Sequence, residues 1–412
     1  MKYLLVIGMG LLSKFGFSQI RGCTDPLASN YNASAVLNDG SCQYSATTIK
    51  PYSSVKLQNQ LSEISGLLRY ENDLWGHNDN SDCRLYRIDS QTGFVKGAMR
   101  MKMGLNRDWQ DVSSDDSLIY VGDFGNNFKG NRKDLTIYLW NKSSIGDSFN
   151  VADSIRFYYP EQTDYSEKSP NSTNFDCEAM VVVGDSIVLF NKEWGTKNTS
   201  IYRLWKRSGS HRAEKIGVLS VDGLITGAAY NPKFNSFVLL GYSDLLQPFV
   251  YLIYDLKGLD FQRCNQRKIL LDLPFYQTEA VEWMDTYKIA VGNERFSNSF
   301  INTAESLQFF NLSLLLGEFY GRSLNLNNFE EVSNMRFEIA QNPGTSNGAS
   351  RLIVRGLDRC LLVQQQVYIM SESGVKLETL SMRSNSLDLP LLSPGVYLVG
   401  NGELGYVKWV VQ

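Results

Sequence analysis

The sequence has little histidine and no excess of either charge. It contains only two histidines in 412 residues, and its 40 basic and 43 acidic residues nearly cancel. With no nucleophile-elbow pattern around any serine, this composition disfavours a Ser-His-Asp hydrolase. No block of lysine and arginine is present, so the chain lacks the footprint of a nucleic-acid-binding protein. Beyond the N-terminal segment, no apolar run reaches the length of a transmembrane helix.

The N-terminal segment has the composition of an export signal. MKYLLVIGMGLLSKFGFSQ combines a basic start, an apolar stretch and small residues near its end. That order predicts a secretory signal peptide over residues 1–18, and therefore a mature chain without a transmembrane segment. Export to an oxidising compartment would allow disulfides among the six cysteines. The sequence does not fix the pairing of four scattered ones, Cys83, Cys177, Cys264 and Cys360.

Residues 19–46 form a short polar segment that two cysteines bracket. A disulfide between Cys23 and Cys42 would close about 20 residues and supply roughly 3 kcal/mol in the chain-entropy model. Hard oxygen ligands of the kind that calcium prefers are plentiful there, in Asp25, Asn30, Asn32 and Asp39. Two interpretations remain open, a calcium-binding loop and a plain disulfide-stapled turn. The order Gly-Cys-Thr-Asp-Pro, Asn-Tyr-Asn and Asp-Gly-Ser-Cys resembles a cysteine-bracketed motif of exported proteins of the Bacteroidetes type.

A repeat organises residues 47–316. Each unit has a polar first residue, an apolar strand, a tight turn and a returning apolar strand, and aromatic residues make up 12% of the chain. The units begin at intervals of 46, 67, 48 and 53 residues, which is typical of four-stranded propeller blades. A spare strand in 47–61 could complete the last blade and leave no edge exposed. We predict an all-β fold with a five-bladed β-propeller, and six blades as the alternative.

The first residues of the five units predict a ring around the propeller axis. Because the first strand of a blade is innermost, the equivalent positions face one channel. Three carboxylates in one channel would raise each other's pKa, and a divalent cation would remove that repulsion. With only oxygen ligands available, calcium is favoured over zinc or copper. The expected metal ligands are Ser65, Asp111, Glu178, Thr226 and Glu279. The alternative is that these residues form hydrogen bonds between blades without a metal.

A second ring is expected at the same mouth of the channel, because antiparallel second strands end where first strands begin. Its side chains are polar and of mixed charge, so they form a candidate ligand site. They are His77, Asn78, Asp79, Asp123, Asn126, Lys192, Glu193, Asn293, Glu294 and Arg295.

Two resemblances accompany these patterns. Residues 62–315 resemble an uncharacterised family of secreted Bacteroidetes-type propellers, through Ser-Gly-Leu at 65–67, Trp75 with His-Asn-Asp at 77–79, and Gly-Asp-Phe-Gly-Asn-Asn at 122–127. The axial ring is weakly similar to that of calcium-activated nucleotidases, five-bladed propellers whose Ser, Glu, Glu, Ser and Glu hold calcium. This second resemblance covers the ring alone and supports the metal more than nucleotide hydrolysis.

The C-terminal region is predicted to be a separate domain. After a polar linker over 317–334, residues 335–412 contain short strands typical of a small Ig-like β-sandwich. They resemble the C-terminal sorting domain of the type IX secretion system, through Asn342-Pro343, the strand and turn of 367–374, and the run from Leu392 to Val399. The resemblance implies the type IX machinery as a partner, passage across the outer membrane, and a secreted or surface-attached protein.

Two functions from different classes follow from these features. The first is a propeller that binds an unknown extracellular ligand or partner at its mouth, with axial calcium as a structural element. The second is a calcium-dependent hydrolase of phosphate esters or anhydrides, in which the metal would polarise a phosphoryl oxygen. Lys192 and Arg295 converging on the metal would favour the hydrolase. The sequence does not decide whether the protein is an enzyme.

Overall fold

The computed structural model describes residues 20–102, 105–144, 148–150, 153–327, 336–340, 351–355, 365–371, 376–382, 386–390, 392–401 and 405–411. The predicted signal peptide, the Asn342-Pro343 turn and Cys360 lie outside these residues. The chain divides into two compact units, Met1–Phe319 and Tyr320–Gln412. No helix among the described residues has both the length and the apolar character needed to cross a membrane.

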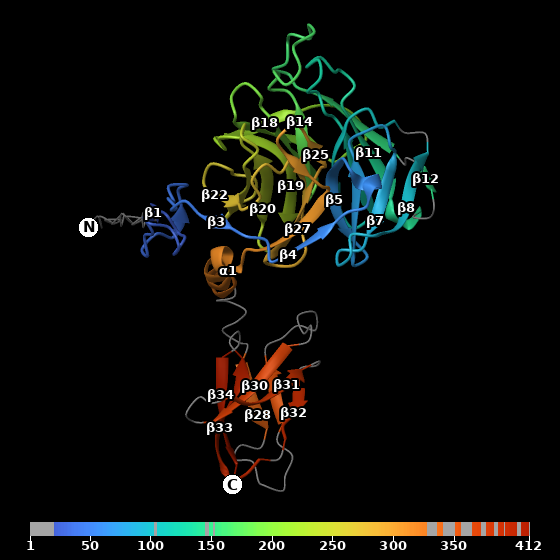
Figure 1. The fold of residues 1–412 in the computed structure, drawn as a ribbon. Coiled ribbons are helices and arrows are strands. Elements are labelled where there is room, and N and C mark those ends of the chain that lie inside the picture. The colour runs from blue at the N-terminus through green and yellow to red at the C-terminus, as the bar shows by residue number, and fades with distance from the viewer. Residues whose placement is uncertain are drawn as a thin grey trace, which may run out of the picture. The chain divides into compact units, whose positions relative to one another are not determined.

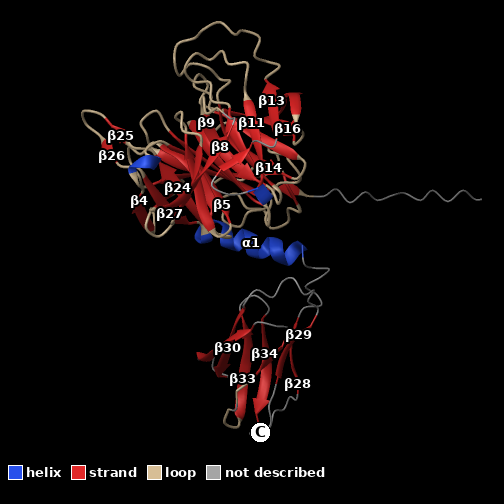
Figure 2. Cartoon of the chain, turned by 90° about the vertical axis from the view of Figure 1, so that its right-hand side faces the viewer, coloured by secondary structure: helices blue, strands red, loops and turns tan. Residues whose placement is uncertain are grey.

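The larger sheets of the first unit pair their inner strands antiparallel in chain order, and three of them add a short outer strand that pairs in parallel (Figures 1 and 2). The first sheet contains β5 (Ile64–Tyr70), β6 (Asp73–Asn78), β7 (Arg84–Ile88), β8 (Val95–Lys102) and β12 (Ser148–Asn150). The second contains β9 (Trp109–Ser114), β10 (Leu118–Asp123), β11 (Thr136–Asn141), β13 (Asp153–Tyr158) and β17 (Gly209–Arg212). The third contains β14 (Cys177–Val183), β15 (Ser186–Asn191), β16 (Thr199–Trp205) and β18 (Glu214–Leu219).

Two further sheets complete the set and include strands from the N-terminal segment. The fourth contains β19 (Leu224–Asn231), β20 (Ser236–Tyr242), β21 (Pro248–Tyr254), β22 (Asn265–Leu271) and the short β3 (Thr48–Ile49). The fifth contains β23 (Thr278–Trp283), β24 (Lys288–Asn293), β27 (Ser306–Asn311) and β4 (Ser53–Lys56). Between β24 and β27 lies a hairpin of β25 (Phe296–Ser297) and β26 (Asn302–Thr303). Single 3-10 turns occur at η1 (Asn59–Leu61) and η2 (Lys142–Ser144).

The innermost strands close a ring. β5 contacts β9, β9 contacts β14, β14 contacts β19, β19 contacts β23, and β23 contacts β5 again. Strand β4 pairs antiparallel with β27, which confirms that the spare N-terminal strand completes the last sheet. The predicted β-propeller is therefore the fold of this unit, and five sheets form its ring among the described residues.

Neighbouring sheets pack face to face through large apolar side chains. Strand β15 is buried along its whole length because both of its faces are covered. Between the third and fourth sheets, the rings of Phe190 and Phe237 lie 6.2 Å apart in an edge-on arrangement, and Val181 and Leu239 belong to the same cluster. This packing fixes where the polar ends of the strands lie.

The Cys-bracketed segment forms a small module on the fourth sheet (Figure 1). Its short strands β1 (Arg21–Gly22) and β2 (Leu37–Asn38) pair in parallel, and the predicted disulfide between Cys23 and Cys42 is present. The Asn38 amide donates to Asp255 and Asn265, at 2.9 and 2.7 Å. The module is therefore fixed to the edge of the propeller by polar contacts.

A helix, α1 (Ser313–Asn327), covers part of the region expected to be a polar linker. Leu312, Leu315, Leu316 and Phe319 recur at three- and four-residue spacing and are buried, as on one face of an amphipathic helix. The Phe319 ring lies 5.1 Å from that of Tyr254. The sequence interpretation missed this helix because it took the glycines and polar residues after 316 as the end of the apolar pattern.

The second unit contains two small antiparallel sheets, as predicted for a β-sandwich. One contains β28 (Arg336–Ala340), β29 (Arg351–Arg355) and β32 (Ser386–Asp388). The other contains β30 (Gln365–Ser371), β31 (Lys376–Met382), β33 (Gly395–Asn401) and β34 (Gly405–Val411). Val367, Ile369, Val399, Leu389 and Trp409 form its core.

Candidate functional site at the acidic mouth

A β-bulge recurs at the start of every inner strand. In each sheet, one residue of the first strand has no partner on the second strand. A bulged residue of this kind can turn its side chain away from the face that strand alternation would give it. The skipped residues are Ser65, Gln110, Glu178, Thr226 and Glu279. Four of the five predicted ring members therefore occupy equivalent positions, but in the second sheet that position belongs to Gln110 and not to Asp111.

Asp111 connects two sheets instead. Its carboxylate accepts hydrogen bonds from the backbone N–H of Val112 at 2.8 Å and of Met180, on the next sheet, at 2.7 Å. Two hydroxyls of the ring act in the same way. Ser65 Oγ donates to the Gln110 carbonyl at 2.9 Å, and Thr226 Oγ1 donates to the Thr278 carbonyl at 2.7 Å. These contacts are the hydrogen bonds between blades that the sequence left open as the alternative to a metal.

The remaining two ring residues face a buried lysine. Lys192 Nζ lies 3.5 Å from Glu178 Oε2 and 3.9 Å from Glu279 Oε2, and all three side chains are at most 6% exposed. The ammonium also lies over the rings of Trp194 and Tyr242, 5.0 and 5.3 Å from their centroids. Burial lowers the pKa of Lys192, but Glu178 and Glu279 outweigh it and hold that pKa well above its usual value.

More carboxyl groups surround this lysine than it can neutralise. Burial, with nearby carboxylates, raises the pKa of Asp79 to about 7 and that of Asp108 to about 6. The same causes raise the pKa of Glu178 and Glu294 well above the usual value, against the opposing effect of Lys192. Glu279 Oε2 is buried and accepts no hydrogen bond. The mouth therefore holds more buried carboxyl groups than positive charges, and a further cation there would favour their ionised form.

A polar residue two positions before the bulge belongs to the same site. Asp176 is fully buried, accepts from Trp194 Nε1 at 2.8 Å, and has its pKa raised by burial. Gln277 bridges two acids by donating to Glu279 at 3.1 Å and to Glu294 at 2.8 Å. Sequence reasoning missed both residues. Each lies just before its strand and two positions before a bulged ring residue, where regular strand alternation does not apply.

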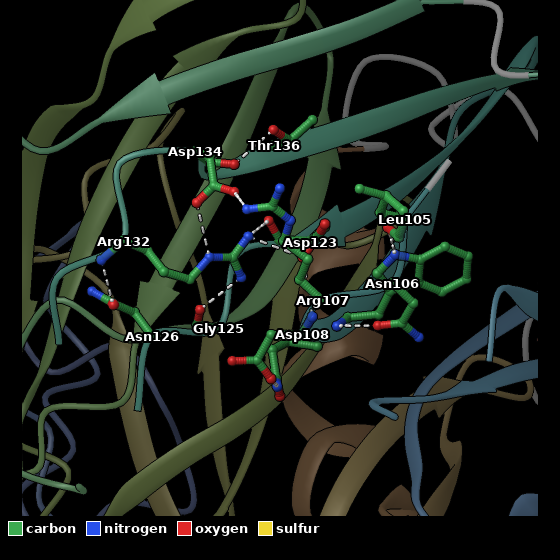
Figure 3. Close-up of polar contacts among 12 residues, drawn as sticks. Leu105, Asn106, Arg107, Asp108, Asp123, Gly125, Asn126, Arg132, Asp134 and Thr136 are labelled. Atoms are coloured by element: carbon green, nitrogen blue, oxygen red, sulfur yellow. Dashed lines mark hydrogen bonds and ion pairs between the residues drawn. The ribbon is translucent and has the colours of Figure 1, made fainter. Parts of the chain in front are cut away.

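Asp123 and Asn126 have structural partners beside the mouth (Figure 3). Asp123 accepts from Arg132 at 3.1 Å, and Arg132 also donates to the Gly125 carbonyl at 2.9 Å and to Asp134 at 3.2 Å. The backbone N–H of Asn126 donates to Asp176 at 2.5 Å, so this loop helps to hold one of the mouth acids. Both residues position the loop that follows β10.

The other predicted mouth residues are also engaged. Asn78 donates to the Gln60 carbonyl, Asn293 donates to the Glu294 and Ala304 carbonyls, and Glu193 accepts from Thr196 and Ser200. Arg295 is exposed and holds Glu305 through two hydrogen bonds of 2.6 and 2.7 Å. Lys192 and Arg295, the cations that the phosphate alternative requires, are thus each paired with different carboxylates.

His77 is fully buried next to the bulge of β5. Burial lowers its pKa to about 4, so the imidazole is neutral at physiological pH. A Cβ atom at position 66 would lie 2.3 Å from His77 Nε2, which explains why glycine occupies that position in Ser-Gly-Leu. The ring also packs edge-on against Trp109, 5.6 Å away, so His77 has a packing role rather than a place among the acids.

Calcium binding stays a prediction. Among the described residues, no group of three or more histidine, cysteine, aspartate and glutamate side chains has an arrangement suited to a metal. A calcium ion between Glu178 and Glu279 would also lie beside the Lys192 ammonium. These two carboxylates do not fit a calcium ion while Lys192 is in this position, because the lysine already supplies the positive charge.

Comparisons with known proteins give only weak matches. No family model and no curated protein matches the chain. The glutaminyl cyclase of Myxococcus xanthus is 9% identical, with a TM-score of 0.38 over 65% of this chain and all of that one. The WD40 repeats of RRP9 are 9% identical, with a TM-score of 0.34 over 63% of this chain and 98% of that one. PorZ, a surface component of the type IX secretion system of Porphyromonas gingivalis, is 11% identical, with a TM-score of 0.32 over 85% of this chain and 45% of that one. All three scores lie below 0.5, so the propeller assignment depends on the sheet topology.

Proposed function

We propose that the protein is an exported binding propeller that takes a cationic ligand at its acidic mouth. The observation that carries this proposal is the charge balance there. Lys192 faces Glu178 and Glu279. Besides burial, Glu279 and Asp108 raise the pKa of Asp79, and Glu279 and Asp79 raise that of Glu294. A further cation would allow these carboxyls to ionise at neutral pH, so its binding would be favoured.

Calcium is one candidate for this cation, through Asp79 and Glu294 rather than through the ring of five. Carboxylate oxygens suit it chemically, and each of these side chains has a raised pKa that a divalent charge would lower. The hydrolase alternative has less support. Arg295 is held by Glu305 and Lys192 by two glutamates, so neither is available to attract a phosphate group to a mouth that is already acidic.

We also propose that residues 335–412 act as an address for the type IX secretion system. The support is the pattern from Leu392 to Val399, which runs into β33 of a two-sheet unit. In a host with this system, the full-length chain should reach the medium or the cell surface. A chain that ends at residue 334 should remain in the periplasm. Equal export of the two chains would contradict this proposal.

The binding proposal is tested by calorimetry on the purified, chelator-treated chain. The probes are calcium chloride and, separately, an acetylated tri-arginine amide. We expect saturable binding of at least one probe, weakened by salt and lost in the double variant Asp79→Asn, Glu294→Gln. The matched control is Asp116→Asn, Asp185→Asn, which removes two exposed acids from turns at the opposite ends of the strands. No binding of either probe, or equal loss in the control, would contradict the proposal.

A further inference from the structure

Large apolar side chains are exposed on the loops that surround the acidic mouth. In an antiparallel propeller blade, the loops after the second and fourth strands lie at the end where the first strand begins. Five such loops carry a strongly exposed apolar residue. These are Leu105 (57% exposed), Phe128 (67%), Leu245 (81%), Phe275 (49%) and Phe300 (97%). We refer to these five residues as the apolar rim.

Hydrogen-bonded turns and loops present three members of the apolar rim to solvent. Asn298 Oδ1 accepts from the N–H groups of Phe300 and Ile301, both at 2.8 Å, at the tip of the β25–β26 hairpin. This hairpin projects from the edge of the unit in Figure 2. The loops that carry Leu245 and Phe275 are joined to each other, because the Phe275 N–H donates to the Leu246 carbonyl at 2.8 Å. These side chains are thus exposed by ordered turns.

Single exposed apolar residues are ordinary on soluble proteins. A set of them on one face, around a polar centre, is instead typical of a protein-binding surface, where aromatic anchors and a central charge supply most of the energy. One feature points to a further cation at that centre. Glu279 Oε2 is buried and accepts no hydrogen bond, because the Lys192 ammonium lies 3.9 Å away and is shared with Glu178. A lysine or arginine side chain can donate a hydrogen bond to such a carboxylate oxygen.

We infer that the ligand is a protein segment that inserts a lysine or arginine side chain into the acidic mouth and lays apolar neighbours on the apolar rim. This inference rests on the proposed function and specifies its ligand class. A free calcium ion would use the carboxylates but would gain nothing from Phe128 or Phe300. A basic side chain with apolar neighbours uses both features, because burial of those neighbours removes apolar surface from water while the carboxylates neutralise the charge.

The inference is tested by selecting binders from a phage-displayed library of random heptapeptides, in the presence of a chelator. The selected peptides should contain lysine or arginine next to leucine, isoleucine, phenylalanine or tryptophan. The best arginine peptide is then resynthesised with citrulline in place of arginine, and separately with alanine in place of its apolar residues. Each change should weaken binding to the full chain at least about tenfold, which is about 1.4 kcal/mol.

Matched variants of the propeller test whether the peptide contacts the apolar rim. Phe128→Ser, Phe300→Ser should weaken the peptide about tenfold or more. Phe94→Ser, Trp205→Ser should leave its affinity unchanged, because these exposed residues lie at the opposite ends of the strands. Selection of peptides without a basic residue, no selection at all, or equal binding of the citrulline peptide would overturn the inference. If calcium or tri-arginine still bound at the mouth, the proposed function would stand and only the protein ligand would be rejected.

Discussion

Two regions of the protein are rich in side-chain oxygens, the Cys-bracketed module and the propeller mouth. They differ in whether those oxygens have hydrogen-bond donors nearby. In the module nearly every oxygen has a nearby donor. Asn30 Oδ1 accepts from the Gln43 N–H at 2.8 Å, Asn32 Oδ1 from Ser34 at 3.0 Å, and Asp39 Oδ1 from Ser41 at 3.0 Å. At the mouth, carboxylates outnumber donors, and Glu279 Oε2 accepts no hydrogen bond.

The pKa values express this difference. Hydrogen bonds from Ser41 lower the pKa of Asp39, whereas burial and carboxylate neighbours raise that of Glu294. Abundant oxygen ligands in a sequence therefore do not predict a cation site by themselves. What matters is whether the fold gives those oxygens local N–H and O–H donors, as turns rich in Asp, Asn and Ser do, or leaves them facing one another. The module satisfies its acids internally, and the mouth does not.

The largest expected effect comes from removing the one cation between Glu178 and Glu279. Lys192→Met would leave both buried carboxylates without their ion pair, and we expect a loss of about 3–5 kcal/mol in the free energy of unfolding. The matched control, Lys168→Met, breaks an exposed pair with Asp164 and should cost at most about 1 kcal/mol. Urea denaturation measures both. Equal losses would show that the mouth carboxyls are neutral and do not require Lys192.

A smaller effect is expected in the module. Asp25 is fully buried and accepts from the hydroxyls of Tyr44 and Tyr254. Asp25→Ala would leave the two hydroxyls with only each other, 3.0 Å apart, as a partner in place of the carboxylate. It should cost about 1–3 kcal/mol, with earlier protease cleavage of the module. Asp39→Ala removes only an exposed turn contact and should change neither the free energy of unfolding nor the rate of protease cleavage measurably. If the two variants behaved alike, Asp25 would not anchor the module, and the contrast between the two regions would fail.

Most of the fold, but only part of the candidate site, could be predicted from the sequence. Alternating apolar strands, their spacing and the spare strand in 47–61 are local or periodic signals, so the propeller and its closure could be predicted. The bulge register could not, because one skipped residue exchanges the faces of Gln110 and Asp111 without changing the composition. The ion-pair partners of the two cations at the mouth could not be predicted either. The sequence shows that Lys192 and Arg295 follow second strands, but only the structure shows that one meets Glu178 and the other Glu305.

The last expected effect is a pH dependence of stability that Asp79 contributes at the mouth. A carboxyl whose pKa is raised in the folded state holds a proton that the unfolded chain releases. For Asp79, stability should therefore fall as pH rises from about 4, its usual pKa, towards about 7, its pKa in the fold. His77 acts in the opposite direction, because its pKa is lowered to about 4. Comparing variant with wild type isolates Asp79.

We expect Asp79→Asn to reduce the stability difference between pH 5 and pH 7.5 by about 2 kcal/mol, measured by urea denaturation at each pH. Asp116→Asn, an exposed acid in the β9–β10 turn, should leave that difference unchanged. A saturating cationic ligand should also reduce it in the wild-type protein, because a neighbouring positive charge favours the ionised carboxyl. Identical pH dependence in all three proteins would mean that Asp79 keeps its usual pKa in the fold, which would remove the distinction between the two regions.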